Sequence, residues 1–206
     1  MLFWTDNPEK NGPKVEKKLR KELGATEPIP FEVEIEGQYK PGSIGQVLGD
    51  MKAQLFGGRC RPLYTFRFTI GSPRPAEVRV SVIKEGGAIV LGSLTYSAPI
   101  AKPVPAPLQL EDAKVFSKSK FIGEPQTAEK LNGNKDLIKA INKFVRTEYS
   151  VGDAKVYANR YLQVVPFEQA SLLTINTLPR ATWMGLGASF DVQPFFGIVS
   201  SIENTL

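Results

Sequence analysis

The chain lacks histidine altogether and has a single cysteine, Cys60, among its 206 residues. Histidine is the usual general base near neutral pH and the commonest metal ligand in proteins. Its absence excludes Ser-His-Asp and Cys-His hydrolases, histidine-ligated zinc or iron sites and histidine phosphotransfer. We therefore assign no catalytic residue and no metal site, and we expect a protein that is not an enzyme.

Nucleotide-binding glycine motifs are missing as well. Neither G-x-x-x-x-G-K-[ST] nor G-x-G-x-x-G occurs, so no cofactor is implied. Carboxylates remain as a source of acid-base chemistry, but they are scattered along the chain, and no spacing brings two of them together. A carboxylate-based enzyme or small-molecule carrier therefore stays the least favoured of three functional hypotheses.

Long hydrophobic runs and paired cysteines are also absent. No apolar stretch approaches the roughly 18 residues that a membrane helix needs, and the opening residues lack the features of a signal peptide. A lone cysteine forms no intrachain disulfide and gives no sign of an oxidising compartment. Hydrophobic residues at 42% and charged residues at 23% are ordinary for globular proteins. These features predict a folded cytoplasmic protein without a transmembrane segment.

Basic residues are in mild excess, with a formal net charge of +5. They concentrate around a hairpin predicted from two strands, Leu63–Ile70 and Glu77–Lys84, which contains one acid, Glu77. Guanidinium groups bind oxyanions bidentately, so this hairpin is the candidate anion-binding surface, for a phosphate, a lipid headgroup or an acidic protein patch. The alternative is a solvated face that discourages edge pairing. The candidate anion-binding residues are Arg59, Arg61, Arg67, Arg74 and Arg79.

Hydrophobic periodicity predicts a mixture of helices and antiparallel strands. The predicted helices are Pro13–Leu23, Ser43–Phe56 and a helix from about Asn134 to Tyr149. A further piece at 110–116 is either helical or extended. The predicted strands, besides the two of the hairpin, are 31–36, 88–96, 120–122, 155–165, 171–178, 181–190 and 195–201.

Four prolines between residues 98 and 107 predict an extended spacer, because proline is excluded from helix and sheet interiors. The spacer divides the chain into an N-terminal peripheral helix (1–30), a first unit (31–97) and a second unit (108–206). Shifting the sequence by about 93 residues matches the two units element by element, although a free offset also produces chance agreement. The predicted fold class is α+β, with antiparallel sheet or sheets, helices on one face, and a pseudo-repeat of two β-α-β-β-β units as an open alternative.

The last 26 residues are apolar with little charge, more so than one small sheet face requires. Some of this surface is expected to meet a partner, unless it is simple core. The partner-surface candidates are Trp183, Met184, Phe195 and Phe196.

The leading functional hypothesis is a non-catalytic interaction or assembly subunit that presents a rigid sheet surface to a protein partner or to further copies of itself. The runner-up is binding of nucleic acid or a membrane surface through the arginine-rich hairpin, which would weaken steeply with salt.

Overall fold

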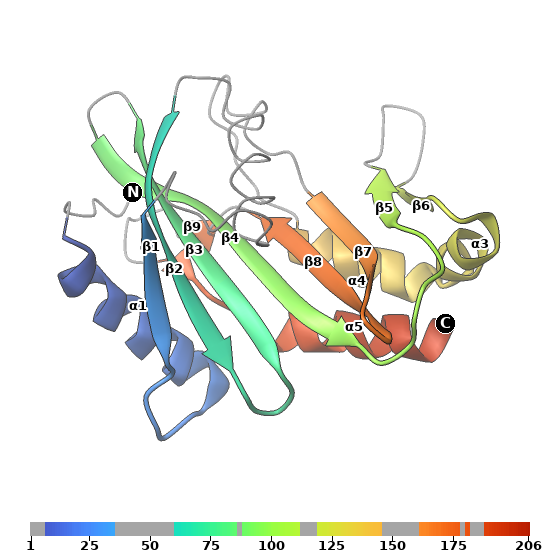
Figure 1. Cartoon of the computed structure of the whole chain (residues 1–206), viewed down its shortest axis with the longest axis horizontal. Coiled ribbons are helices and arrows are strands. Elements are labelled where there is room, and N and C mark those ends of the chain that lie inside the picture. The colour runs from blue at the N-terminus through green and yellow to red at the C-terminus, as the bar shows by residue number, and fades with distance from the viewer. Residues whose placement is uncertain are drawn as a thin grey trace.

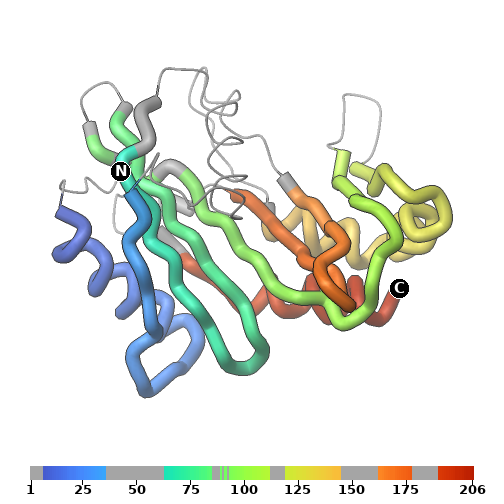
Figure 2. Tube along the Cα trace, in the orientation of Figure 1, coloured from blue at the N-terminus to red at the C-terminus, as the bar shows by residue number. Residues whose placement is uncertain are grey.

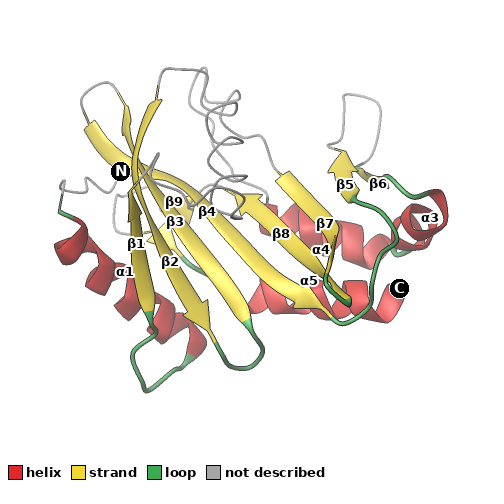
Figure 3. Cartoon of the chain, in the orientation of Figure 1, coloured by secondary structure: helices red, strands yellow, loops and turns green. Residues whose placement is uncertain are grey.

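The computed structural model describes residues 7–35, 60–85, 88–111, 119–145, 161–177, 180–181 and 188–206. Within them, an antiparallel sheet of eight strands is covered on one face by helices, which confirms the predicted α+β class (Figures 1 and 3). The strand order is β1-β2-β3-β4-β8-β7-β5-β6. The strands of this sheet are β1 (Phe31–Ile35), β2 (Cys60–Ile70), β3 (Ala76–Glu85), β4 (Ala88–Ile100), β5 (Leu108–Glu111), β6 (Lys120–Ile122), β7 (Tyr161–Phe167) and β8 (Ala170–Thr177). The helices are α1 (Pro8–Leu23), α3 (Pro125–Gly133), α4 (Lys135–Val145) and α5 (Gln193–Thr205).

Strict alternation of side chains gives the sheet two different faces. In β2, Phe66 and Phe68 are fully buried and pair across to Val80 and Val78 of β3. The residues between them carry hydroxyl and guanidinium groups and point the other way, because successive side chains of a strand alternate. We call these the helical face and the polar face of the sheet.

Helix α1 begins earlier than predicted. The side chain of Asn7 accepts a hydrogen bond from the backbone N–H of Lys10 at 3.0 Å, and Pro8 occupies the first turn, where its missing N–H costs nothing. Gly24, at a φ of 66°, ends the helix in the left-handed conformation. Val15 and Leu19 are fully buried against the sheet, so the narrow apolar stripe is enough to dock this helix.

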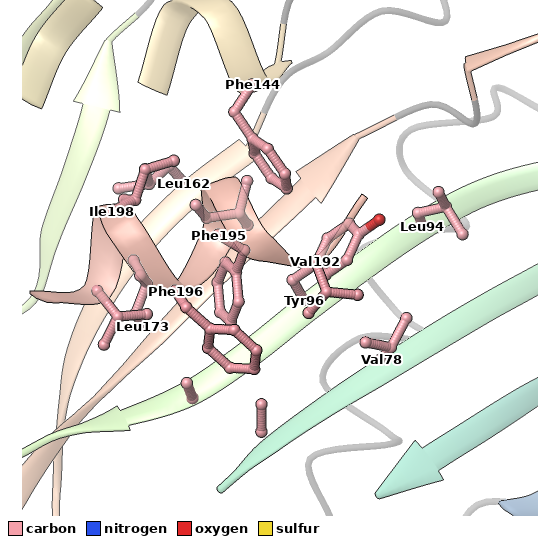
Figure 4. Packing of buried hydrophobic residues seen from close by; sticks show 14 of the residues in the cluster. Val78, Leu94, Tyr96, Phe144, Leu162, Leu173, Val192, Phe195, Phe196 and Ile198 are labelled. Atoms are coloured by element: carbon pink, nitrogen blue, oxygen red, sulfur yellow. The ribbon is translucent and has the colours of Figure 1, made fainter. Parts of the chain in front are cut away.

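The segment predicted as a strand at 195–201 is instead helix α5, so that prediction was wrong. Short continuous apolar runs do not distinguish a buried strand from a buried helix. The observed burial of Phe195, Phe196, Ile198, Val199 and Ile202 follows the helical period. Helix α5 contacts β4 and α4, and Figure 4 shows Phe195, Phe196 and Ile198 in the buried cluster that also contains Tyr96 of β4. Of the predicted strand 181–190, the described residues contain two short strands, β9 (Arg180–Ala181) and β10 (Ala188–Ser189), which pair with each other.

Helix α3 was not predicted, although its start carries a clear signal. The Glu124 carboxylate accepts hydrogen bonds from the backbone N–H groups of Gln126 and Thr127, at 3.0 and 2.7 Å, and Pro125 follows it in the first turn. Ala128 and Leu131 are the buried residues of this short helix. Two buried residues in a helix of nine are too few for a helical period to be recognised in the sequence.

The predicted spacer is partly wrong, because residues 98–100 continue β4 and pair with β8. The Pro99 carbonyl accepts a long hydrogen bond of 3.5 Å from Arg74 Nη2. The N–H and C=O of one strand residue point the same way, so the missing N–H of Pro99 faces Arg74 and not β8. Proline is tolerated there because β3 pairs with β4 only as far as Ser97.

The β4–β8 pairing joins strands from both predicted units into one sheet, and Figure 2 shows these two distant segments side by side. The domain boundaries and the internal duplication stay predictions. The predicted helix Ser43–Phe56 lies outside the described residues.

Candidate functional site: the charged cluster on the polar face of the sheet

The polar face carries hydrophilic side chains in rows that cross the strands. One row runs from β1 to β8 because the register places their residues opposite one another. Its members are Glu32, Arg67, Arg79, Thr95 and Asn176. The row changes from charged groups on β1, β2 and β3 to neutral groups on β4 and β8.

The charged half forms a cluster of three carboxylates and two guanidinium groups, which we call the charged cluster: Glu32, Glu34, Arg67, Glu77 and Arg79. Arg67 Nη2 is bonded to Glu32, and Arg79 donates to Glu77 through Nε and to Glu34 Oε2 through Nη1 at 3.0 Å. Arg67 Nε lies 3.9 Å from both Glu34 and Glu77. These contacts tie three strands together, and the cluster keeps one net negative charge.

Along the row that crosses the strands, exposure rises from Arg79 on β3 through Arg67 on β2 to Glu32 on β1. The side chain of Arg79 is 6% exposed, that of Arg67 is 32% exposed and that of Glu32 is 67% exposed. Desolvation by itself lowers the pKa of the Arg67 guanidinium, but the hydrogen bond to Glu32 and the neighbouring carboxylates outweigh it and raise that pKa. Arg79 therefore has a structural position, whereas Glu32, although bonded to Arg67, is largely exposed to solvent.

Most of the other polar side chains on this face carry hydroxyl groups and are buried, whereas the amide of Asn176 is only half-buried. Ser97 and Thr174 lie 3.3 Å apart, and Thr65 and Ser81 lie 3.4 Å apart, each pair on adjacent strands. Ser93 Oγ is buried without a hydrogen-bond partner in the described part of the chain. Bonds between neutral groups hold strands in register and do not activate an oxygen for attack.

The structure divides the predicted arginine set. Arg67 and Arg79 come together in the charged cluster, whereas Arg74 lies in the turn before β3 and binds Glu203 of α5 with both terminal nitrogens, at 2.7 and 3.0 Å. Arg59 lies outside the described residues, and Arg61 is placed only by its backbone in β2. Each of the three described arginines is thus already paired with glutamate, and anion binding by the set stays a prediction.

The pairing of Arg74 with Glu203 predicts a particular acid sensitivity. The hydrogen bond from Arg74 lowers the pKa of the Glu203 carboxyl, burial opposes this, and the N–H of Ala101 adds to it. A lowered folded pKa means that the ionised carboxylate stabilises the fold above its ordinary pKa of 4.5, and that this contribution is lost as pH falls through the folded value.

We expect Glu203→Gln to lower the free energy of unfolding by about 1–2 kcal/mol at pH 7 and to flatten its decline below pH 4.5. Urea unfolding as a function of pH measures both effects. An unchanged acid slope in the variant would show that the pair makes no such contribution.

The aromatic partner-surface candidates on α5 are buried within the chain itself. Phe195 is 0% exposed and Phe196 is 6% exposed, while Trp183 and Met184 lie outside the described residues. The large apolar side chains that are exposed, among the described residues, are Val33, Ile35, Ile122 and Phe167.

Two of these exposed apolar residues, Val33 and Ile35, belong to β1, which the sequence predicted only as a strand with one acidic face. A signal was present, because Phe31, Val33 and Ile35 alternate with the acids. The sequence could not show that β1 is an end strand of the sheet. In that position Phe31 is half-buried, whereas Val33 and Ile35 stay exposed.

The described residues contain no group of three or more potential ligands able to hold a metal ion. No helix in the described ranges is both long and apolar enough to cross a membrane.

The fold and the charged cluster together define an α+β protein whose antiparallel sheet has one face packed by helices and one polar face. Comparison with known proteins assigns no family. No family model matches the sequence, and no curated protein and no solved structure matches it significantly.

Proposed function

We propose that the protein is a non-catalytic interaction subunit that presents the β1 end of its sheet to a protein partner. One observation supports this most directly: β1 is an end strand of the described sheet, and it exposes Val33 by 40% and Ile35 by 56%. An end strand offers unpaired backbone groups, and exposed apolar side chains on it favour addition of a further strand. The ion pairs of the charged cluster connect β1 to β2 and β3 behind it.

The chemistry of β1 favours a different protein over a second copy. Two β1 strands paired antiparallel about Val33 would place Glu32 of one copy opposite Glu34 of the other, and like charges directly opposite are destabilising. A partner strand that alternates apolar residues with basic or neutral polar residues avoids this repulsion. Its apolar side chains would cover Val33 and Ile35, with a gain of about 1–2 kcal/mol per residue.

The proposal predicts that Val33→Lys/Ile35→Lys weakens partner binding without unfolding the protein, because both side chains are exposed and lysine disfavours strand addition. A partner retrieved from the native source with the tagged chain would be purified and its affinity for both forms measured by calorimetry. We expect at least a tenfold weaker Kd for the double variant.

The matched control is Ile122→Lys/Phe167→Lys, which makes the same change at the two large exposed apolar side chains that the described residues contain outside β1. This control should bind like the wild type. Equal binding by the β1 variant, or a chain that stays a monomer by light scattering and retrieves nothing, would contradict the proposal.

A further inference from the structure

Helix α1 carries a straight row of lysines on its outer side. Lys10, Lys14, Lys17 and Lys21, which we call the lysine row, are all exposed. At 100° per residue they fall within an arc of about 60°, and at 1.5 Å per residue they extend over about 16 Å. The buried residues of α1 lie on the opposite side, against the sheet.

The other cations of α1 are compensated, whereas the lysine row is not. Arg20 Nε lies 3.2 Å from Glu16 Oε1, and Lys18 Nζ lies 5.9 Å from the centre of the Phe190 ring. Burial lowers the pKa of Lys18, which fits its inward position. The four lysines of the row form no ion pair within the described part of the chain. Solubility alone does not explain them, because four acidic residues at these positions would make the helix equally soluble.

This arrangement disfavours the isolated helix. Lys10 and Lys14, and likewise Lys17 and Lys21, are like charges four residues apart, which repel on a helix surface. Lys10 also lies in the first turn, where the helix dipole disfavours a positive charge. An anionic partner along the row would reduce both the repulsion between the lysines and the unfavourable interaction of Lys10 with the helix dipole. A row that alternated lysine with glutamate would not have had the repulsion.

We propose that the lysine row docks an acidic helix of a protein partner. This inference goes beyond the proposed function, because it uses a different surface from the β1 edge and stands or falls without it. A helix whose carboxylates recur at the same spacings of four, three and four residues would lie alongside α1 and form interhelical ion pairs. Each exposed pair is weak alone, so binding depends on several pairs forming together and weakens with salt.

Two features of the surroundings favour a narrow protein partner over a broad anionic surface. The exposed acids Glu9 and Glu22 flank the row near its two ends, and Glu32 on neighbouring β1 is exposed as well. On the helical wheel the two α1 acids lie about 110° to either side of the middle of the row, so the positive strip is about as narrow as one helix.

The composition of α1 also disfavours nucleic acid. The helix has no aromatic side chain on which bases could stack, and its one arginine, Arg20, is paired with Glu16.

The test uses the full chain and a synthetic helical peptide that carries four glutamates at the spacings of the row, with a second peptide in which the same glutamates are spread around the helix. Binding is followed by fluorescence anisotropy at low salt. We expect the fourfold variant Lys10→Gln/Lys14→Gln/Lys17→Gln/Lys21→Gln to bind the first peptide at least about tenfold more weakly than the wild type.

The matched control removes the same number of charges from exposed lysines elsewhere and should bind like the wild type: Lys84→Gln/Lys130→Gln/Lys135→Gln/Lys139→Gln. Thermal unfolding checks the fold of both variants, and the row variant should be no less stable. Retention of peptide binding by Val33→Lys/Ile35→Lys would separate this surface from the β1 edge.

Several results would overturn the inference. An equal loss of peptide affinity in the control variant would show that binding depends only on net charge. Equal affinity for the peptide with spread glutamates would show that the spacing of the row has no role. Tighter row-dependent binding of a DNA duplex, or of vesicles with equal amounts of phosphatidylcholine and phosphatidylserine, would assign the row to those partners instead. Absence of any binding by the wild type would reject it outright.

Discussion

Replacing Phe195 by alanine lowers the free energy of unfolding by about 3–5 kcal/mol, the range expected for loss of a fully buried phenyl ring. Phe195 is 0% exposed and lies at the centre of an aromatic group, with its ring 5.5 Å from Tyr96, 6.3 Å from Phe144 and 6.0 Å from Phe196 (Figure 4). These rings come from β4, α4 and α5, so the substitution opens a cavity where three elements meet.

Urea unfolding of Phe195→Ala and Phe167→Ala measures this effect against a matched control. Phe167 is 40% exposed, so its truncation should change the free energy of unfolding by less than about 1 kcal/mol. If the two variants were equally stable, Phe195 would not be a core residue in solution, and it would again be a candidate for the partner surface.

The strands and their faces could be predicted because alternation is a local property. The sequence of β2 and β3 placed the aromatics and valines on one side and Arg67 and Arg79 on the other, and the register confirms this. Helix α4 was likewise predictable, since Leu137 and Ile141 repeat at helical spacing and are both buried. In each case the spacing of apolar residues within a short segment was enough to predict both the element and its buried side.

The partners of the arginines could not be predicted because they are distant in sequence. Arg79 is bonded to Glu34, 45 residues away, and Arg74 to Glu203, 129 residues away. Counting charges within the hairpin left out the acids that β1 and α5 bring to it. The alternating Glu32 and Glu34 were nonetheless a signal, because an acidic strand face complements a basic one on an adjacent strand.

These pairings change where the basic surface of the protein lies. The described hairpin arginines are engaged by glutamates and hold β1, β3 and α5 in place, whereas the lysine row of α1 has no such partners among the described residues. A sum of charges predicts an anionic partner but not the surface that meets it. The lysine row and the β1 edge are therefore tested separately, each with its own set of substitutions.

Gly123→Ala is expected to lower the free energy of unfolding by about 2–4 kcal/mol, because two costs coincide at this turn between β6 and α3. Gly123 has a φ of 134°, which residues with a side chain rarely adopt. An added Cβ would overlap the backbone oxygen of Pro107 and lie 3.1 Å from Leu108 Cα, at the start of β5. Neither backbone atom can move without disturbing β5, which pairs with both β6 and β7.

Gly24→Ala is the control that separates the two costs. Gly24 also has a positive φ, of 66°, but an added Cβ there meets nothing within 4 Å, so the loss should be limited to about 1 kcal/mol for the left-handed backbone. Urea unfolding of the two variants gives the difference directly. Equal losses would mean that the backbone conformation alone matters and that β5 gives way to the added methyl group. A larger loss at Gly123 would show that the β5–β6 end of the sheet is packed as tightly against its turn as the distances indicate.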